Sequence, residues 1–487
     1  MCLAQVSPAQ SSQKVTLDTS ETLFTILGAM NLCGYDQDLN LSDPLRKQIR
    51  DELTKSADSS PDAKASAQTM CQFYRDHEQP EAWRTLSQYV SLALYSNPVP
   101  AFSIKGREAD LPPDASYVQG IFPLLQKFYQ TAAMEQIWQR HKDAYNGLTE
   151  RYHEPLAKML FDTEVYLKLP SAGYLGRSFT VYLDPLGASG QTNARNYAAD
   201  YYVVISPGAS ASLKMDEIRH TYLHYLLDPL ALKYPTNAKR LEPLLDTVKN
   251  APMDESFKND ISLLLTESLI RAIEVRTSQG KPTEAEKENA VKASMEQGFI
   301  LTQYFFDALK QFEKDPAGLR NSYGQMLTNI DVNKEQKRAA QVEFAKKADP
   351  ELLHLSRPLE GKLLSTAEQK LYAGDSATAG KLAQQALDEK SEDPGRALFI
   401  LARIATMNRD MQGARTYFQR ALESTQEPKV VAWSHIYLGR IFDLQEDRAA
   451  ALDQYRAALN AGASLPEAKK AAEHGMQQPY EPPGHSQ

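Results

Sequence analysis

The chain has 487 residues, of which 42% are hydrophobic and 24% are charged, and its net charge at pH 7 is -8. This length and composition predict a globular protein of two or three domains. The acidic net charge argues against a general nucleic-acid-binding protein. The sequence has no run of 18 apolar residues, so it predicts no membrane-spanning helix.

The first residues, 1–15, have some features of an export signal. Residues 2–5 read CLAQ, which is similar to the end of a signal peptide cleaved after Ala4. The charged and apolar parts that precede such a site are missing. The segment is therefore either the remnant of a clipped signal, which would imply a periplasmic or extracellular protein, or a disordered start.

Residues 16–150 are expected to form a helical N-terminal region. Apolar residues recur at helical spacing over residues 116–148. An earlier helix is expected to have Ser42 as its N-cap and Pro44 in its first turn. Cys33 and Cys71 also lie in this region; they could pair in an exported chain, whereas a cytosolic chain would keep them reduced.

Residues 151–350 are expected to form a small α+β domain. Residues 178–186 and 200–207 are rich in Val, Ile, Tyr and Phe, which predicts two strands joined by a loop. A helix should follow from about Lys214 to Leu227 and stop at Pro229. Further helices are predicted over residues 256–280, 285–314 and 333–348.

Two histidines on the first of these helices form a candidate metal site. His220 and His224 are four residues apart, so they lie on one face of a helix and could hold one zinc ion. Glu267 lies among leucines on a later helix, where a carboxylate needs a cation or a hydrogen-bond partner. The predicted zinc ligands are therefore His220, His224 and Glu267. The alternative is a metal-free core in which Glu267 pairs with Arg271 or His220.

The order of two strands, a helix with His-x3-His and a helix with Glu resembles the gluzincin metallopeptidases over about residues 170–345. The resemblance implies a zincin-like fold and a zinc site, with Asp228 orienting an imidazole from outside the ligand shell. The family's general base follows the first histidine, and Thr221 stands there instead. Two other carboxylates share helix faces with the predicted ligands: Glu217 lies near the face of His220, and Glu274 lies on the face of Glu267. Glu217 is a candidate fourth ligand.

The C-terminal region repeats a pattern that can be aligned on Asp375, Asp410 and Asp447. An alanine follows each aspartate after four residues, and an Ala-Leu pair begins eleven residues after it. These alanines are Ala379, Ala414 and Ala451, then Ala386, Ala421 and Ala458. The pattern closely resembles the tetratricopeptide repeat, a helix–turn–helix of about 34 residues.

This second resemblance implies about three repeats and a capping helix over residues 355–475, followed by a disordered tail, 476–487. The concave face of such an array would be lined by Arg403, His435 and Arg440. The whole chain is thus expected to be mainly α-helical: a helical N-terminal region, a small zincin-like α+β domain and a C-terminal α-solenoid.

Two functions fit these expectations. In the first, the chain is a zinc-binding, zincin-like protein, either a hydrolase with an unusual base or a pseudo-peptidase, whose repeats bind a protein partner. In the second, it is a non-enzymatic scaffold whose central domain is purely structural. Neither function involves nucleic acid or a membrane span.

Overall fold

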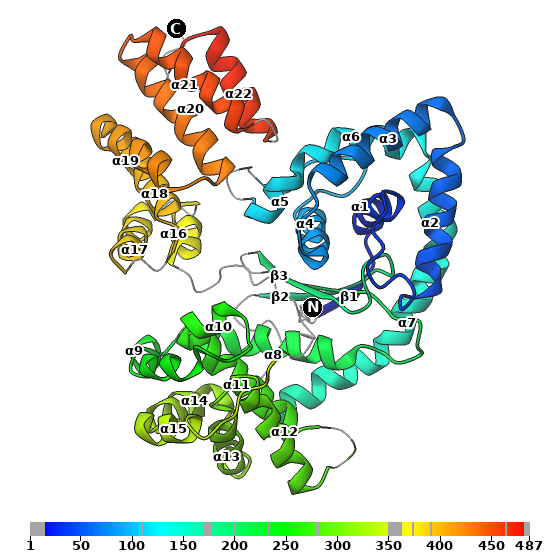
Figure 1. The fold of residues 1–487 in the computed structure, drawn as a ribbon, viewed down its shortest axis with the longest axis vertical. Helices are drawn as coiled ribbons and strands as arrows, with labels where there is room; N and C mark the ends of the chain where they lie inside the picture. The colour runs from blue at the N-terminus through cyan, green and yellow to red at the C-terminus, as the bar shows by residue number, and fades with distance from the viewer. Residues whose placement is uncertain are drawn as a thin grey trace, which may run out of the picture.

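The structure is a computed structural model that describes residues 15–481, apart from 107, 109–110, 170–176, 198–199, 232, 279, 281, 349–362, 373–374, 390–391 and 463–464. The described chain is mainly helical and has one four-stranded sheet (Figure 1). None of its helices combines the length and the apolar character that a bilayer crossing requires. The expectations for residues 1–14 and 482–487 lie outside the described residues, whereas Val15 begins a strand, Val15–Asp18, and residues 476–477 belong to a helix, Pro466–Gln477.

The N-terminal region forms a bundle of helices above one face of the sheet, and its last helix continues past the sheet into the core of the central helices (Figure 1). Its elements are β1 (Val15–Asp18), α1 (Glu21–Leu32), α2 (Pro44–Ala57), α3 (Pro61–Asp76), α4 (Ala82–Leu94), α5 (Pro113–Val118), α6 (Phe122–Thr131) and α7 (Met134–Leu167). The expected N-cap of α2 is wrong by one residue: Asp43 caps the helix by accepting a hydrogen bond from the backbone of Leu45. Ser42 instead accepts a hydrogen bond from the buried Arg46.

The sheet has the strand order β1-β2-β4-β3, with β2 at Ser178–Leu183, β3 at Thr192–Tyr197 and β4 at Asp200–Ile205. β1, β2 and β4 are parallel, and β3 runs antiparallel to β4. The two predicted strands are confirmed as β2 and β4. The loop expected between them is wrong, because it contains β3. The sequence of β3 is polar, but the strand is buried, and its Arg195 donates a hydrogen bond to the backbone of Ser87.

The sheet separates two hydrophobic cores because successive side chains of a strand point to opposite faces. Phe179 and Val203 belong to the core that contains the central helices. Val204, the neighbour of Val203, belongs to the core of the N-terminal helices. The sheet thus joins the two regions, and the central helices pack against one of its faces.

The central region continues with α8 (Met215–Ala231), α9 (Pro235–Lys239), α10 (Glu255–Asn259), α11 (Ile261–Arg276), α12 (Glu284–Glu296), α13 (Thr302–Phe312), α14 (Leu319–Thr328) and α15 (Val332–Ala339). The expected stop of α8 at Pro229 is wrong, since the helix runs on to Ala231. A proline removes the N–H that would bond the carbonyl four residues earlier. Here that carbonyl belongs to Tyr225, and Arg177 donates to it at 3.1 Å instead.

The helix expected over residues 285–314 is also corrected, because it consists of α12 and α13. Gly298 lies between them with φ at +111°, a conformation that glycine adopts without strain. Its Cα faces Ala251 and Met253, so a side chain there would clash as well. The break brings α13 back against α11.

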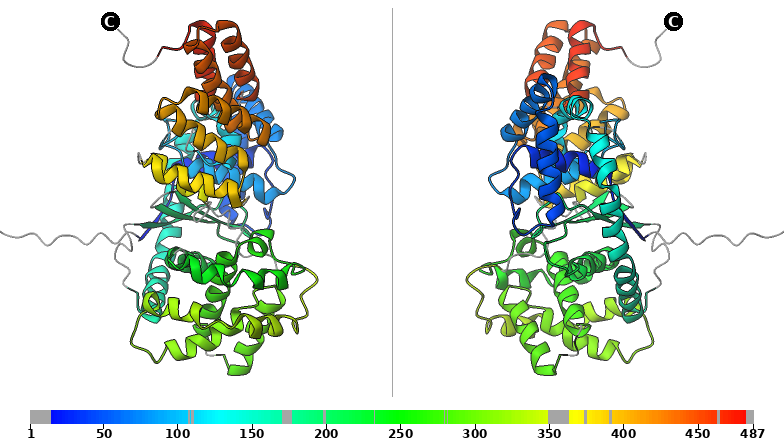
Figure 2. Two further views of the ribbon diagram at one scale, coloured as in Figure 1. Left: turned by 90° about the vertical axis from the view of Figure 1, so that its left-hand side faces the viewer. Right: turned by 90° about the vertical axis from the view of Figure 1, so that its right-hand side faces the viewer.

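The described part of the C-terminal region contains the helices α16 (Leu363–Tyr372), α17 (Ser376–Glu389), α18 (Pro394–Met407), α19 (Met411–Ser424), α20 (Pro428–Leu444), α21 (Arg448–Ala461) and α22 (Pro466–Gln477). Consecutive helices pack in pairs, and each pair packs on the next. Both views of Figure 2 place α20–α22 at the end of the molecule opposite α12 and α13. The three aligned aspartates, Asp375, Asp410 and Asp447, each accept a hydrogen bond from the backbone N–H three residues later.

Small residues set the distance between the paired helices. The six aligned alanines are buried. Gly439 of α20 lies against the ring of Tyr455 of α21, where an added Cβ would come within 2.7 Å of Tyr455 Cε1. The two helices therefore approach as closely as the backbone allows.

The Gly439→Ala variant tests this packing. Because the new methyl group would overlap the Tyr455 ring, we expect a loss of about 1–3 kcal/mol in stability, measured by thermal unfolding. Gly380→Ala in α17 is the matched control: its Cβ would make only an ordinary contact, 3.5 Å from Ile404 Cδ1. That variant should gain about 0.5–1 kcal/mol because alanine favours the helix. An unfolding midpoint for Gly439→Ala at or above that of Gly380→Ala would contradict the account.

Candidate metal centre

The three predicted ligands come together where α8 packs against α11. His220 and His224 project from one face of α8, and their ring centroids are 5.0 Å apart. Glu267 Oε2, on α11, lies 3.2 Å from His224 Nε2 and 3.6 Å from His220 Nε2. One carboxylate oxygen therefore faces both imidazoles.

The cluster is largely shielded from solvent. The side chains of His224 and Glu267 are 1% and 2% exposed, and that of His220 is 14% exposed. One ligand atom from each of the three residues lies within 4.8 Å of the others. Two imidazole nitrogens and a carboxylate oxygen are a donor set that zinc binds, so this group could hold a metal ion. No metal is identified by the geometry alone.

Each imidazole is held from behind by a second carboxylate. His224 Nδ1 lies 3.0 Å from Asp228 Oδ1, and His220 Nδ1 lies 2.9 Å from Glu274 Oε1. A histidine whose Nδ1–H donates to a carboxylate presents the lone pair of Nε2 on the other side of the ring. The outer carboxylates thus aim both Nε2 atoms at the point that Glu267 faces.

Glu267 also has an outer partner. Arg271 Nε donates to Glu267 Oε1 at 2.8 Å, and the Arg271 guanidinium lies 3.9 Å from the centroid of the Phe299 ring. This is the ion pair expected for a metal-free core. It uses only Oε1, however, so Oε2 still faces the histidines. The arrangement accommodates both the metal site and the ion pair.

Opposite charges in the cluster shift the pKa values of His220 and Glu267. Burial alone would lower the pKa of His220, but the carboxylates of Glu274 and Glu267 outweigh burial and raise that pKa to about 10. Burial would raise the pKa of Glu267, but His220 and Arg271 hold it well below its ordinary range. Glu267 is therefore an anion ready to bind a cation, whether imidazolium or metal.

Thr221 and Glu217 offer no base at the cluster. Thr221 is fully buried, and its Oγ1 donates to the backbone carbonyl of Glu217 at 2.9 Å. The Glu217 carboxylate lies 3.8 Å from Lys214 Nζ and is not part of the three-residue group. Glu217 is thus not placed as a fourth ligand.

The role of Glu274 was not predicted from the sequence. Its spacing of seven residues from Glu267 places both on one face of α11. That spacing could have identified the partner of His220; for His224, the resemblance to the gluzincins implied Asp228.

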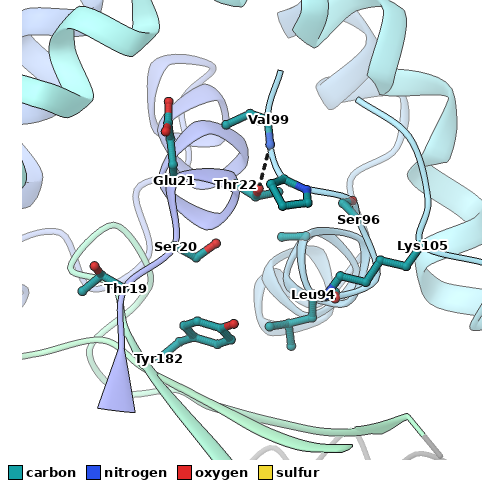
Figure 3. A pocket seen from close by; sticks show the side chains of 11 residues that line it. Thr19, Ser20, Glu21, Thr22, Leu94, Ser96, Val99, Lys105 and Tyr182 are labelled. Carbon is teal, nitrogen blue, oxygen red and sulfur yellow. Dashed lines mark hydrogen bonds between the residues drawn. The ribbon is translucent and has the colours of Figure 1, made fainter. Parts of the chain in front are cut away.

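A second hollow lies far from this cluster, at the start of α1 (Figure 3). It has a volume of about 240 Å³ and is lined by residues of α1, α4 and the segment after α4, with Tyr182 of β2. Lys105 donates to the carbonyl of Leu94 at 2.8 Å, and Thr22 Oγ1 accepts from the backbone of Val99. These polar groups already bond to the chain, so we assign no site there.

Comparisons of the chain with protein-family models, curated proteins and solved structures found no match.

The metal content of the purified, untagged protein tests the site. We expect about one zinc per chain by elemental analysis. His220→Ala and Glu267→Gln should each reduce it sharply, because three protein ligands are the usual minimum for a tight site. His153→Ala, which removes an exposed histidine of α7, is the control and should leave the content unchanged. A wild-type protein that takes up no zinc on dialysis would contradict the metal assignment.

Proposed function

We propose that this protein is a zincin-like zinc-binding protein without ordinary peptidase activity, and that its C-terminal repeats bind another protein. One observation carries the metal part of the proposal. His220 and His224 each turn Nε2 toward the same oxygen of Glu267, while Nδ1 of each ring bonds to a separate carboxylate. A metal site needs this common direction of the two Nε2 atoms, and it also needs each ring to be fixed from outside, as the two outer carboxylates do here.

The chemistry of the cluster supports binding more than hydrolysis. A bound zinc ion would supply a Lewis acid and lower the pKa of a coordinated water. Removal of the water's proton needs a base within hydrogen-bonding reach. Thr221 cannot accept a proton near neutral pH, and its hydroxyl is engaged by the helix backbone. Asp228 and Glu274 are engaged behind the histidines.

The second candidate function, a non-enzymatic scaffold, is favoured by the ion pair between Arg271 and Glu267. With that pair in place, a protonated His220 can face the second oxygen of Glu267 without a metal. The metal content of the wild-type protein separates the two functions.

We also infer that the C-terminal helices form tetratricopeptide repeats. The supporting observations are the capping aspartates, the buried alanines and the close approach of Gly439 to Tyr455. Stacked helical pairs form a curved surface that binds protein segments. The expected lining includes Arg403, His435 and Arg440, which are all half-buried.

An oxidising compartment is the proposed location. Cys33 and Cys71 form a disulfide that links the end of α1 to α3. Disulfides persist mainly in exported proteins, because the cytosol keeps thiols reduced.

A peptide library incubated with the zinc-loaded protein tests the absence of peptidase activity. General-base catalysis typically contributes ~10²–10⁴-fold to a rate, so we expect cleavage by wild type no greater than that by Glu267→Gln in mass spectrometry. A metallopeptidase of known activity serves as the positive control. Robust cleavage by wild type that a chelator and Glu267→Gln both abolish would overturn this part of the proposal.

A further inference from the structure

The last helix of the array, α22, lacks a cap from its own sequence. The first turn of a helix leaves backbone N–H groups without partners, and Ser, Thr, Asp or Asn usually accepts from them. The N-cap position of α22 is held by Leu465, which has no side-chain acceptor. By contrast, α17, α19 and α21 begin with the aspartates described above.

Glu108, from the segment between α4 and α5, supplies the missing acceptor. Its Oε2 accepts from the backbone N–H of Glu467 at 2.5 Å, and its Oε1 accepts from that of Ala468 at 3.3 Å. The backbone N–H of Glu108 in turn donates to Glu467 Oε2 at 3.1 Å. This reciprocal pattern is that of a capping box, but its two halves lie 359 residues apart.

The Glu108 side chain is well suited to this role. Glu108 is fully buried, and a buried carboxylate is stable only with hydrogen-bond donors or a cation. The start of a helix provides both N–H donors and the positive end of the helix dipole. Nearby, Lys429 of α20 donates to the carbonyl of Leu111 at 3.3 Å, and Leu111 belongs to the core of the N-terminal helices.

These contacts join two bodies that otherwise have separate cores. Over the described residues, the hydrophobic clusters of α16–α22 contain no residue of the N-terminal or central regions. Within the same part of the chain, hydrogen bonds tie the array to the N-terminal region at Glu108 and Leu111. Figure 1 shows that α20 and α22 begin on the side of the array that faces α5.

We propose that Glu108 is a latch that docks the repeat array on the N-terminal region by capping α22. While the latch is closed, the first turn of α22 is ordered and the end of the array is fixed against the body. When Glu108 leaves, α22 loses its cap and the array can move relative to the rest of the chain. The latch thus couples the position of the array to the order of its last helix.

Hydrogen exchange of the full-length protein tests the latch. In Glu108→Ala, the amides at the start of α22 should exchange roughly 3- to 30-fold faster, the range expected for loss of a helix cap. The radius of gyration from X-ray scattering should rise, while exchange in α1 stays at its wild-type rate. Glu473→Ala, which removes an exposed carboxylate of the same helix, is the control and should change neither measurement.

A second variant is needed because Glu108 is buried, so that Glu108→Ala could disturb the fold as a whole. Glu467→Ala removes an exposed side chain and the reciprocal bond from the Glu108 N–H, while both backbone bonds from α22 to the Glu108 carboxylate remain, so it should speed exchange in the same turn by a smaller factor. If Glu108→Ala speeds exchange in α1 as well, Glu467→Ala decides the question. Wild-type exchange at the start of α22 in Glu467→Ala and in any folded Glu108→Ala protein would overturn the proposal.

Discussion

The carboxylate of Glu267 is the charge around which the central region is organised. Its side chain is 2% exposed and lies between two helices. An unpaired carboxylate at such a position would lower the stability of the fold by several kcal/mol. One oxygen is satisfied by Arg271, and the other faces His220 and His224. The packing of α8 on α11 therefore depends on a positive charge between them, and either a protonated histidine or a metal ion can provide it.

The carboxylates behind the histidines extend this constraint. Asp228 and Glu274 fix the rings so that both Nε2 atoms point inward. The ring of Phe179 in the sheet packs against Tyr222 and Tyr225 of α8, and this packing positions the helix on the sheet. Thr221 stands where the proposed resemblance to the gluzincins would place a base, and its hydroxyl donates to the backbone of its own helix. The proposal of metal binding without ordinary peptidase activity rests on this position.

Sequence reasoning predicted what local pattern encodes. The spacing of His220 and His224 placed them on one face, and the leucines around Glu267 indicated its burial. The prediction was wrong where contacts between distant residues determine the structure. The polar sequence of β3 predicts a loop, but its buried Arg195 donates hydrogen bonds to α4 and to Asp114, so the segment can form a buried strand. The prediction also ended α8 at Pro229, because the guanidinium that takes over the freed carbonyl lies 48 residues away in sequence. Glu108 and α22 are an extreme case, since no local pattern links them.

X-ray absorption at the zinc edge of the zinc-loaded wild-type protein tests the central claim most directly. The account predicts a first shell of nitrogen and oxygen donors with the multiple-scattering pattern of two imidazoles, which should fall to one imidazole in His224→Ala if that variant still binds zinc. A first shell of oxygen donors without imidazole scattering, or a wild-type spectrum that is unchanged in His224→Ala, would show that zinc binds elsewhere and contradict the account.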